Sequence, residues 1–215
     1  MRLSNKRYSL YAENCLKEKN MKTILCYGDS NTWGCVPGVL TRHPKEVRWT
    51  SVLARLLGEE YEVIPDGING RTTMWDDPAN QCRNGLKGLG YSLYRAKPLD
   101  LVIVMLGTND GHYTDHAGYR DGLYVLADRI MKANKCFPGT SPVFPGEPKL
   151  LLISPIERTA QKFPEMTAEV AEKVGAYWMD AAQFAKASPA DGCHMDAQNH
   201  LALGQAVYEK VKEIL

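Results

Sequence analysis

Residues 23–31 read Thr-Ile-Leu-Cys-Tyr-Gly-Asp-Ser-Asn, a short apolar run that ends in a polar turn. The apolar part, 23–27, has the length and composition of a strand buried in a sheet. Ser30 follows closely, and Gly28 permits a tight exit from the strand. A serine at the end of a buried strand is well placed to be a nucleophile. Its hydroxyl is barely ionised at neutral pH, so it needs a general base and a group that orients the base. Alternatively, Asp29 or Ser30 only caps a helix, a common role for both residue types.

Outward from this run, apolar runs alternate with helical patterns along the chain. The expected strands are 23–27, 61–64, 101–106, 150–153 and a shorter fifth at 177–179. The expected helices are 49–57, about 119–133, 168–174 and about 197–215, the last with Leu201, Tyr208, Val211 and Leu215 on one stripe. Long loops are expected at 74–90 and 135–149, where they would line a site or an interface. The alternation predicts a three-layer α/β/α sandwich with a mostly parallel five-stranded sheet of flavodoxin-like type. In such a sheet, ligands bind at the carboxyl ends of the strands.

Composition excludes several classes of function. The chain has 215 residues, of which 44% are hydrophobic, and a formal net charge of +1. This length supports a single domain over 21–215, and the balanced charge predicts neither nucleic acid nor an anionic membrane as partner. No apolar run approaches the roughly 20 residues that span a bilayer. The six cysteines are scattered without metal-ligand spacing, so we expect reduced thiols in a cytoplasmic protein that needs no metal or cofactor.

Residues 1–20 differ from the rest of the chain. They are rich in basic side chains but lack the continuous apolar segment of a secretory signal. We expect an N-terminal extension that is either mobile or an amphipathic arm.

Asp191 and His194 supply the general base and its partner. They lie three residues apart in a loop just before the last expected helix. This spacing lets the carboxylate hold one imidazole nitrogen while the other faces a serine. The alternative is a capping Asp with an incidental His. His200 falls inside the expected helix, where packing or surface exposure is its expected role. Cys193 adjoins His194, but neighbouring side chains in an extended loop point apart, so we expect it to be a bystander.

Two further turns at strand ends offer donors for a developing negative charge. Asn109, in Gly-Thr-Asn-Asp, follows the strand at 101–106 and can aim its side-chain NH₂ into the site, although it can also simply close an Asx-turn. Gly70, in Asn-Gly-Arg, follows the second strand and offers a backbone N–H that no side chain obstructs. Trp33 can wall an acyl or alcohol pocket, or can simply belong to the core.

In this order along the chain, the motifs resemble those of the SGNH (GDSL-type) hydrolases. The matching residues are Ser30 in Gly-Asp-Ser, Gly70 in Asn-Gly-Arg, Asn109 in Gly-Thr-Asn-Asp, and Asp191 and His194 in Asp-x-x-His. The resemblance covers residues 21–215 and implies the SGNH hydrolase fold. It implies catalysis by Ser30, His194 and Asp191, with an oxyanion hole from Ser30, Gly70 and Asn109. One departure is Asn31, where the family name expects Leu.

Further segments resemble the bacterial arylesterase branch of that superfamily. They are Gly-Asp-Ser-Asn-Thr-Trp-Gly at 28–34, Val-Arg-Trp-Thr at 47–50, Arg-Thr-Thr at 71–73, Asp-Asp-Pro at 76–78 and Leu-Asp-Leu-Val-Ile at 99–103. The resemblance implies a serine esterase that hydrolyses short-chain aryl or alkyl esters through an acyl-enzyme. It also implies acyl transfer to alcohols or peroxide, and a homo-oligomer.

Two other functions stay open at this stage. A carbohydrate O-acetyl esterase would use the same triad, because specificity lies in the loops. A non-catalytic α/β binding protein would keep the scaffold alone. The sequence disfavours a nucleotide-binding module, because it has neither Gly-x-Gly-x-x-Gly after the first strand nor Gly-Lys-Ser/Thr.

Overall fold

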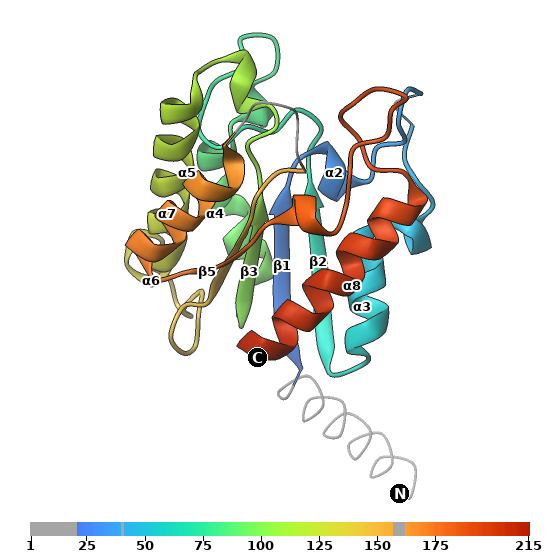
Figure 1. The fold of residues 1–215 in the computed structure, drawn as a ribbon. Coiled ribbons are helices and arrows are strands. Elements are labelled where there is room, and N and C mark those ends of the chain that lie inside the picture. The colour runs from blue at the N-terminus through green and yellow to red at the C-terminus, as the bar shows by residue number, and fades with distance from the viewer. Residues whose placement is uncertain (1–20, 40, 157–161) are drawn as a thin grey trace, which may run out of the picture.

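A parallel sheet forms the centre of the molecule (Figure 1). In the residues that this computed structural model describes, 21–39, 41–156 and 162–215, it has five strands in the order β2-β1-β3-β4-β5. The strands are β1 (Lys22–Gly28), β2 (Tyr61–Gly67), β3 (Leu101–Met105), β4 (Leu150–Ile153) and β5 (Tyr177–Met179). All neighbouring pairs are parallel, so every strand ends at the same edge of the sheet. The predicted α/β class and strand number are confirmed.

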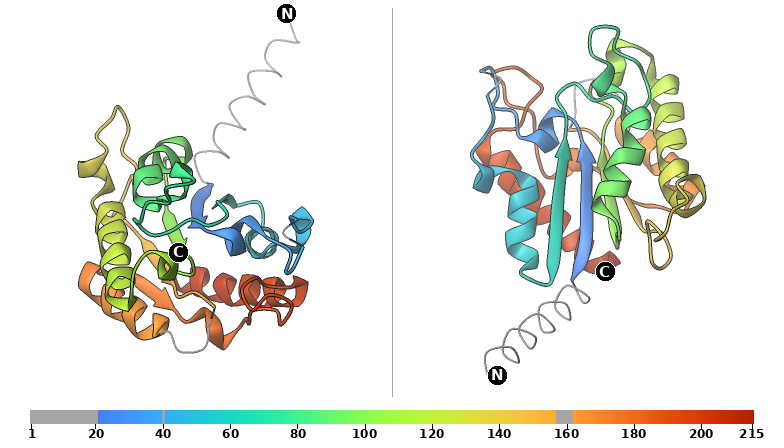
Figure 2. Two further views of the ribbon diagram at one scale, coloured as in Figure 1. Left: turned by 90° about the horizontal axis from the view of Figure 1, so that it is seen from above. Right: turned by 180° about the vertical axis from the view of Figure 1, so that it is seen from behind.

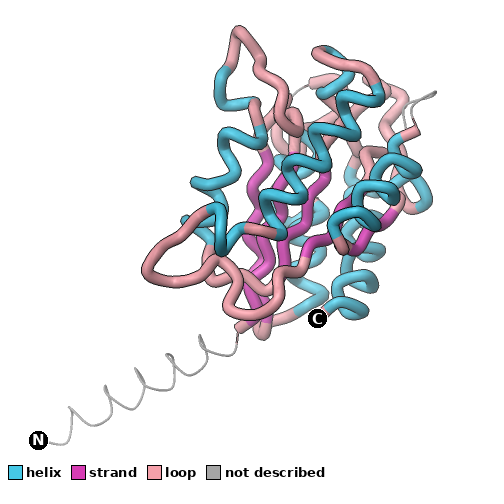
Figure 3. The backbone as a smooth tube through the Cα atoms, turned by 90° about the vertical axis from the view of Figure 1, so that its left-hand side faces the viewer, coloured by secondary structure: helices cyan, strands magenta, loops and turns pink. Residues whose placement is uncertain are grey.

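Helices cover both faces of this sheet. The longer ones are α3 (Trp49–Leu57), α4 (Gly85–Ala96), α5 (His116–Met131), α7 (Phe163–Val174) and α8 (Ala197–Ile214). Figure 2 shows the two helical layers from above and from behind, and Figure 3 shows the helices in cyan around the magenta strands. The expected three-layer sandwich is therefore present.

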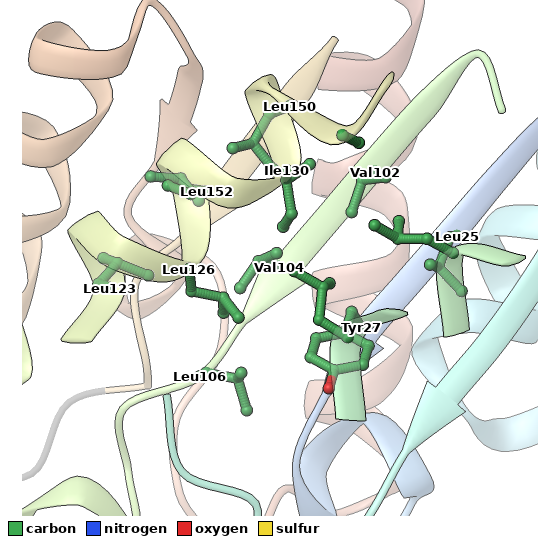
Figure 4. Close-up of a cluster of buried hydrophobic side chains, with 14 of the residues drawn as sticks. Leu25, Tyr27, Val102, Val104, Leu106, Leu123, Leu126, Ile130, Leu150 and Leu152 are labelled. Carbon is green, nitrogen blue, oxygen red and sulfur yellow. The ribbon is translucent and has the colours of Figure 1, made fainter. Parts of the chain in front are cut away.

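Alternation along the strands explains the two helical layers. In β1, Leu25 and Tyr27 point into the core shared with α4, α5 and α7, part of which Figure 4 shows. Ile24 and Cys26 point to the opposite face, into the core shared with α3 and α8. All four side chains are buried, as expected where successive residues face opposite sides of a covered sheet.

Strand β2 is longer than the sequence predicted. It continues past residue 64 through Pro65 to Gly67, in register with the whole of β1. Pro65 is tolerated because β2 is an edge strand, where a missing N–H need not break the sheet.

The loop predicted at 74–90 is wrong over its last six residues, because helix α4 begins at Gly85. Asn84 caps this helix by accepting a hydrogen bond from the Lys87 backbone N–H at 2.9 Å. The glycines that suggested a loop serve close packing instead. A Cβ at Gly85 would lie 2.5 Å from the Thr72 carbonyl oxygen.

The stripe predicted on the last helix is also partly wrong. Leu201 is 41% exposed, whereas Val211 is buried as predicted. The buried face of α8 is formed by His200, Leu203, Gly204, Val207, Val211 and Ile214. The buried face is rotated relative to the predicted stripe because α8 packs on α3 at Gly204, which has no side chain and lets the two helices approach closely.

The other predicted helices are present, and two of them differ from prediction at their ends. Helix α3 has the predicted bounds, α5 begins at His116 and ends at Met131, and α7 begins earlier, at Phe163. The expected extension at 1–20 lies outside the described residues.

We predict that Gly204→Ala lowers the free energy of unfolding by about 1–2 kcal/mol, because overpacking a core outweighs the better helix propensity of alanine. The added Cβ would lie 2.6 Å from the Val52 Cβ and 2.9 Å from the Trp49 carbonyl oxygen. Urea unfolding measures the change. Gly146→Ala is the control, since nothing lies within 4 Å of its Cβ. Equal stability of Gly204→Ala and wild type would contradict this packing.

Candidate active site

Ser30 begins the short helix α2 (Ser30–Trp33), directly at the carboxyl end of β1. Asp29 caps this helix by accepting a hydrogen bond from the Asn31 backbone N–H at 2.9 Å. Two glycines allow the turn. A Cβ at Gly28 would lie 2.1 Å from Thr32 Oγ1, and one at Gly67 would lie 2.1 Å from the Trp33 nitrogen. The turn is so tightly packed that Ser30 is only 5% exposed.

The segment before α8 brings His194 and Asp191 to this turn. Figure 1 shows that segment, in red-orange, beside α2 above the strand ends. His194 Nε2 lies 3.1 Å from Ser30 Oγ, and His194 Nδ1 lies 2.8 Å from Asp191 Oδ2. The three side chains that the sequence singled out are therefore in one hydrogen-bonded row.

The protonation state of Asp191 decides how this row works. Burial alone would raise the pKa of Asp191, but hydrogen bonds from the His194 backbone and ring and from the backbones of Gly38 and Cys193 hold that pKa well below its usual range. An ionised carboxylate only accepts hydrogen bonds, so His194 Nδ1 carries the hydrogen. In the neutral imidazole, Nε2 is then the acceptor that faces the Ser30 hydroxyl.

Gly70 and Asn109 lie in turns that are tied to each other. Gly70 has φ +77°, a conformation that glycine adopts readily. The Arg83 side chain packs closely against it, because a Cβ at Gly70 would lie 2.5 Å from Arg83 Nε. Asn109 Nδ2 donates to the carbonyl oxygen of Arg71, the residue that follows Gly70, at 3.0 Å. An amide NH₂ has two hydrogens, so the second stays available. Within the described residues, the N–H groups of Ser30 and Gly70 have no acceptor.

Arg71 is a buried support whose structural role the Arg-Thr-Thr segment did not indicate. Its guanidinium donates to the carbonyl oxygens of Gly28 at 3.0 Å and Asp66 at 2.6 Å, and pairs with the Asp66 carboxylate at 2.9 Å. The guanidinium also lies 3.9 Å from the centre of the Tyr27 ring. Arg71 thereby joins the ends of β1 and β2 to the turn that carries Gly70. A buried arginine in a short Gly-Arg-Thr-Thr motif gives little signal in a single sequence.

Trp33 and His200 lie outside the hydrogen-bonded row. The Trp33 ring packs on Arg42, whose Cζ lies 4.9 Å from the ring centre. His200 is fully buried and accepts a hydrogen bond from the Trp49 backbone N–H at 3.3 Å, so of its two expected roles, packing and surface exposure, it has the first.

The described residues contain neither a candidate metal site nor a helix that could span a membrane. His, Cys, Asp and Glu side chains there form no group of three that could hold a metal ion. No helix in that part of the chain has the length and apolar character to cross a bilayer.

Two carboxyl groups are buried at the carboxyl edge of the sheet, Asp29 after β1 and Asp110 after β3. Burial raises the pKa of Asp29 to about 6, against the opposing effect of the Asn31 backbone hydrogen bond. Burial likewise raises the pKa of Asp110 to about 7, although Thr73 donates to it from its backbone and its hydroxyl. Both groups therefore change charge near neutral pH.

Comparisons with known proteins agree with this fold and motif order. The model of the GDSL-like lipase/acylhydrolase family matches residues 26–209. The chain belongs to this family. A search of curated proteins found no match.

Solved structures of similar proteins include esterases of two kinds. The native aryl esterase of M. smegmatis is 32% identical, with a TM-score of 0.80, over 90% of this chain and 100% of that one. A carbohydrate acetylesterase family member from Sinorhizobium meliloti is 32% identical, with a TM-score of 0.81, over 91% and 99%. Est24, a carbohydrate acetylesterase from the same organism, is 29% identical, with a TM-score of 0.81, over 90% and 100%.

The fold and these relatives place the GDSL-like chain in the SGNH superfamily, as an esterase that hydrolyses carboxylic esters. The interpretation as a non-catalytic binding protein is set aside.

The buried Asp110 generates a prediction about stability and pH. Its pKa is about 7 in the folded state and about 4 when unfolded, so between these values the folded state holds a proton that the unfolded state releases. This group therefore makes wild type less stable as pH rises from about 4 to 7. Asp110→Asn removes the titration, so its stability relative to wild type should increase with pH over that window and then level off. Urea unfolding from pH 4 to 8 measures the difference, and a pH-independent difference would contradict the shift.

Proposed function

We propose that Ser30 is the nucleophile of this esterase, His194 its general base and Asp191 the group that orients the base. The observation that carries the proposal is the row of two hydrogen bonds, 3.1 Å from Ser30 to His194 and 2.8 Å from His194 to Asp191. In the reaction, Ser30 Oγ attacks the ester carbonyl while His194 Nε2 takes its proton. His194 then gives that proton to the departing alcohol, leaving an acyl group on Ser30.

We propose that the N–H groups of Ser30 and Gly70 and the side-chain amide of Asn109 hold the oxyanion. The bond from Asn109 to the Arg71 carbonyl supports this role, because it fixes the amide beside the Gly70 turn before substrate arrives. Donors that need no rearrangement during the reaction stabilise the developing charge most effectively. Water or another acceptor then attacks the acyl-enzyme, with His194 again as base.

The proposed substrates are short-chain aryl or alkyl esters. The likeness to an aryl esterase over the whole of that chain supports an aromatic leaving group. Acyl transfer to alcohols or peroxide, a substrate contact by Trp33, a homo-oligomer and a cytoplasmic location stay predictions.

A carbohydrate O-acetyl esterase is the second candidate, favoured by the likeness to two carbohydrate acetylesterases. Turnover of phenyl acetate and of an acetylated sugar separates the two candidates. The assay should use esters of differing acyl length and should include an alcohol or peroxide as an acceptor that competes with water. Preference for the sugar ester would favour the second candidate.

We predict that Ser30→Ala lowers kcat/KM for an aryl acetate by about 10⁴-fold or more, because single losses from a triad are of this order. Its melting temperature should stay close to that of wild type. Ser51→Ala, on α3, is the control for loss of a hydroxyl, and Cys193→Ala tests the neighbouring thiol. Near-wild-type turnover by clean Ser30→Ala protein would remove Ser30 as nucleophile.

We predict that Asn109→Ala lowers kcat by about 10²–10³-fold with a much smaller change in KM, since loss of one oxyanion donor typically costs about 2.7–4 kcal/mol in the transition state. Steady-state kinetics with an aryl acetate measure both constants. A change confined to KM would instead make Asn109 a binding residue.

A further inference from the structure

The segment that carries Asp191 and His194 is held together by its own hydrogen bonds. Asp191 Oδ1 accepts from the backbone N–H groups of Cys193 and His194, both at 2.9 Å. The Ser188 N–H donates to the His194 carbonyl oxygen at 2.8 Å. These bonds fix the acid relative to the base, but they do not fix either of them relative to Ser30.

Asn31 makes the connection to the nucleophile turn. Its Oδ1 accepts from the Met195 backbone N–H at 3.0 Å, and its Nδ2 donates to the Cys193 carbonyl oxygen at 3.2 Å. The two backbone groups lie on either side of His194. The Met195 N–H can only donate and the Cys193 carbonyl can only accept, so the amide fits in one orientation.

The position of Asn31 makes this clamp short and stiff. Asn31 directly follows Ser30, is 1% exposed, and has its own backbone N–H fixed by Asp29 at 2.9 Å. One residue therefore joins the backbone of Ser30 to the backbone on both sides of His194. Gly38 and His43 also touch the segment, through Asp191 Oδ2 at 2.9 Å and the Met195 carbonyl oxygen at 3.2 Å. Those two residues lie beyond α2, so they do not replace the direct connection.

We propose that Asn31 is a positioning residue that sets the distance between the Ser30 hydroxyl and the His194 imidazole. This inference rests on the proposed roles of Ser30 and His194. It concerns a position where this chain departs from the Leu in the family name. In this chain a leucine, which has a similar size, would make neither hydrogen bond, so the segment with the imidazole would lose its direct connection to the turn of Ser30.

The test is Asn31→Leu, with Asn134→Leu as the matched control. Asn134 makes the same kind of clamp away from the site, donating to the Phe144 carbonyl oxygen at 2.8 Å and accepting from the Val143 N–H at 2.8 Å. Both substitutions leave backbone groups without partners, which should lower the melting temperature of both. Only Asn31→Leu should slow the reaction.

For Asn31→Leu we expect kcat with an aryl acetate to fall by about 10- to 100-fold while KM changes by less than about threefold, because small displacements of a catalytic group have effects of this size. The rate of labelling by a fluorophosphonate should fall in parallel. Wild-type kcat in folded Asn31→Leu, or an equal fall of kcat in Asn134→Leu, would overturn the proposal. If Asn31→Leu does not fold, Asn31→Asp is measured by the same criteria. Its carboxylate can accept from Met195 but cannot donate to Cys193.

Ser30→Ala and His194→Ala in the same assay distinguish failure of the proposed function from failure of the role proposed for Asn31. Full activity in either variant would overturn the proposed function itself. Loss of activity in both, with wild-type kcat in Asn31→Leu, would overturn only the role of Asn31.

Discussion

The hydrogen bond between Ser30 Oγ and His194 Nε2 joins residues 164 positions apart, and the rest of the site is arranged around it. The parallel sheet makes the contact possible, because all its strands end at one edge and the connecting turns meet there. Ser30 follows β1, the turn with Gly70 follows β2, and Asn109 follows β3. The segment before α8 lies at the same edge and brings the imidazole of His194 to Ser30. Arg71 ties the ends of β1 and β2 to the turn that carries Gly70. Asn31 joins the turn of Ser30 to the backbone on both sides of His194.

The fold was largely predictable because its central strands, β1, β3 and β4, are buried on both faces. Runs such as Leu101–Met105 consist of large apolar residues, all of them buried, and this pattern is typical of a central parallel strand. The errors arose where close packing uses glycine. Helix α4 was taken for a loop because Gly85, Gly88 and Gly90 lower its helix propensity, whereas its start depends on the Asn84 cap and on space that only glycine leaves. The rotated face of α8 has the same origin, since its contact with α3 centres on Gly204.

The site was predictable to a different extent. Ser30, Asp191 and His194 were singled out because a serine nucleophile needs a base and an acid that orients it, and because the motifs resemble those of the SGNH hydrolases in their order. The structure brings the three side chains within hydrogen-bond distance. The supports were missed because their partners are backbone groups. Arg71 binds two carbonyl oxygens and Asn31 binds the backbone around His194, contacts that no spacing rule reveals. The raised pKa values of Asp29 and Asp110 also depend on burial, which follows only from the folded chain.

The most direct test of the account is to locate the covalent adduct of a fluorophosphonate by mass spectrometry of the digested protein. The account predicts one adduct, on Ser30, because among the described residues only that hydroxyl lies within hydrogen-bond distance of an imidazole. It also predicts that His194→Ala forms this adduct far more slowly. An adduct on another residue, or labelling of Ser30 at an unchanged rate in His194→Ala, would contradict the account.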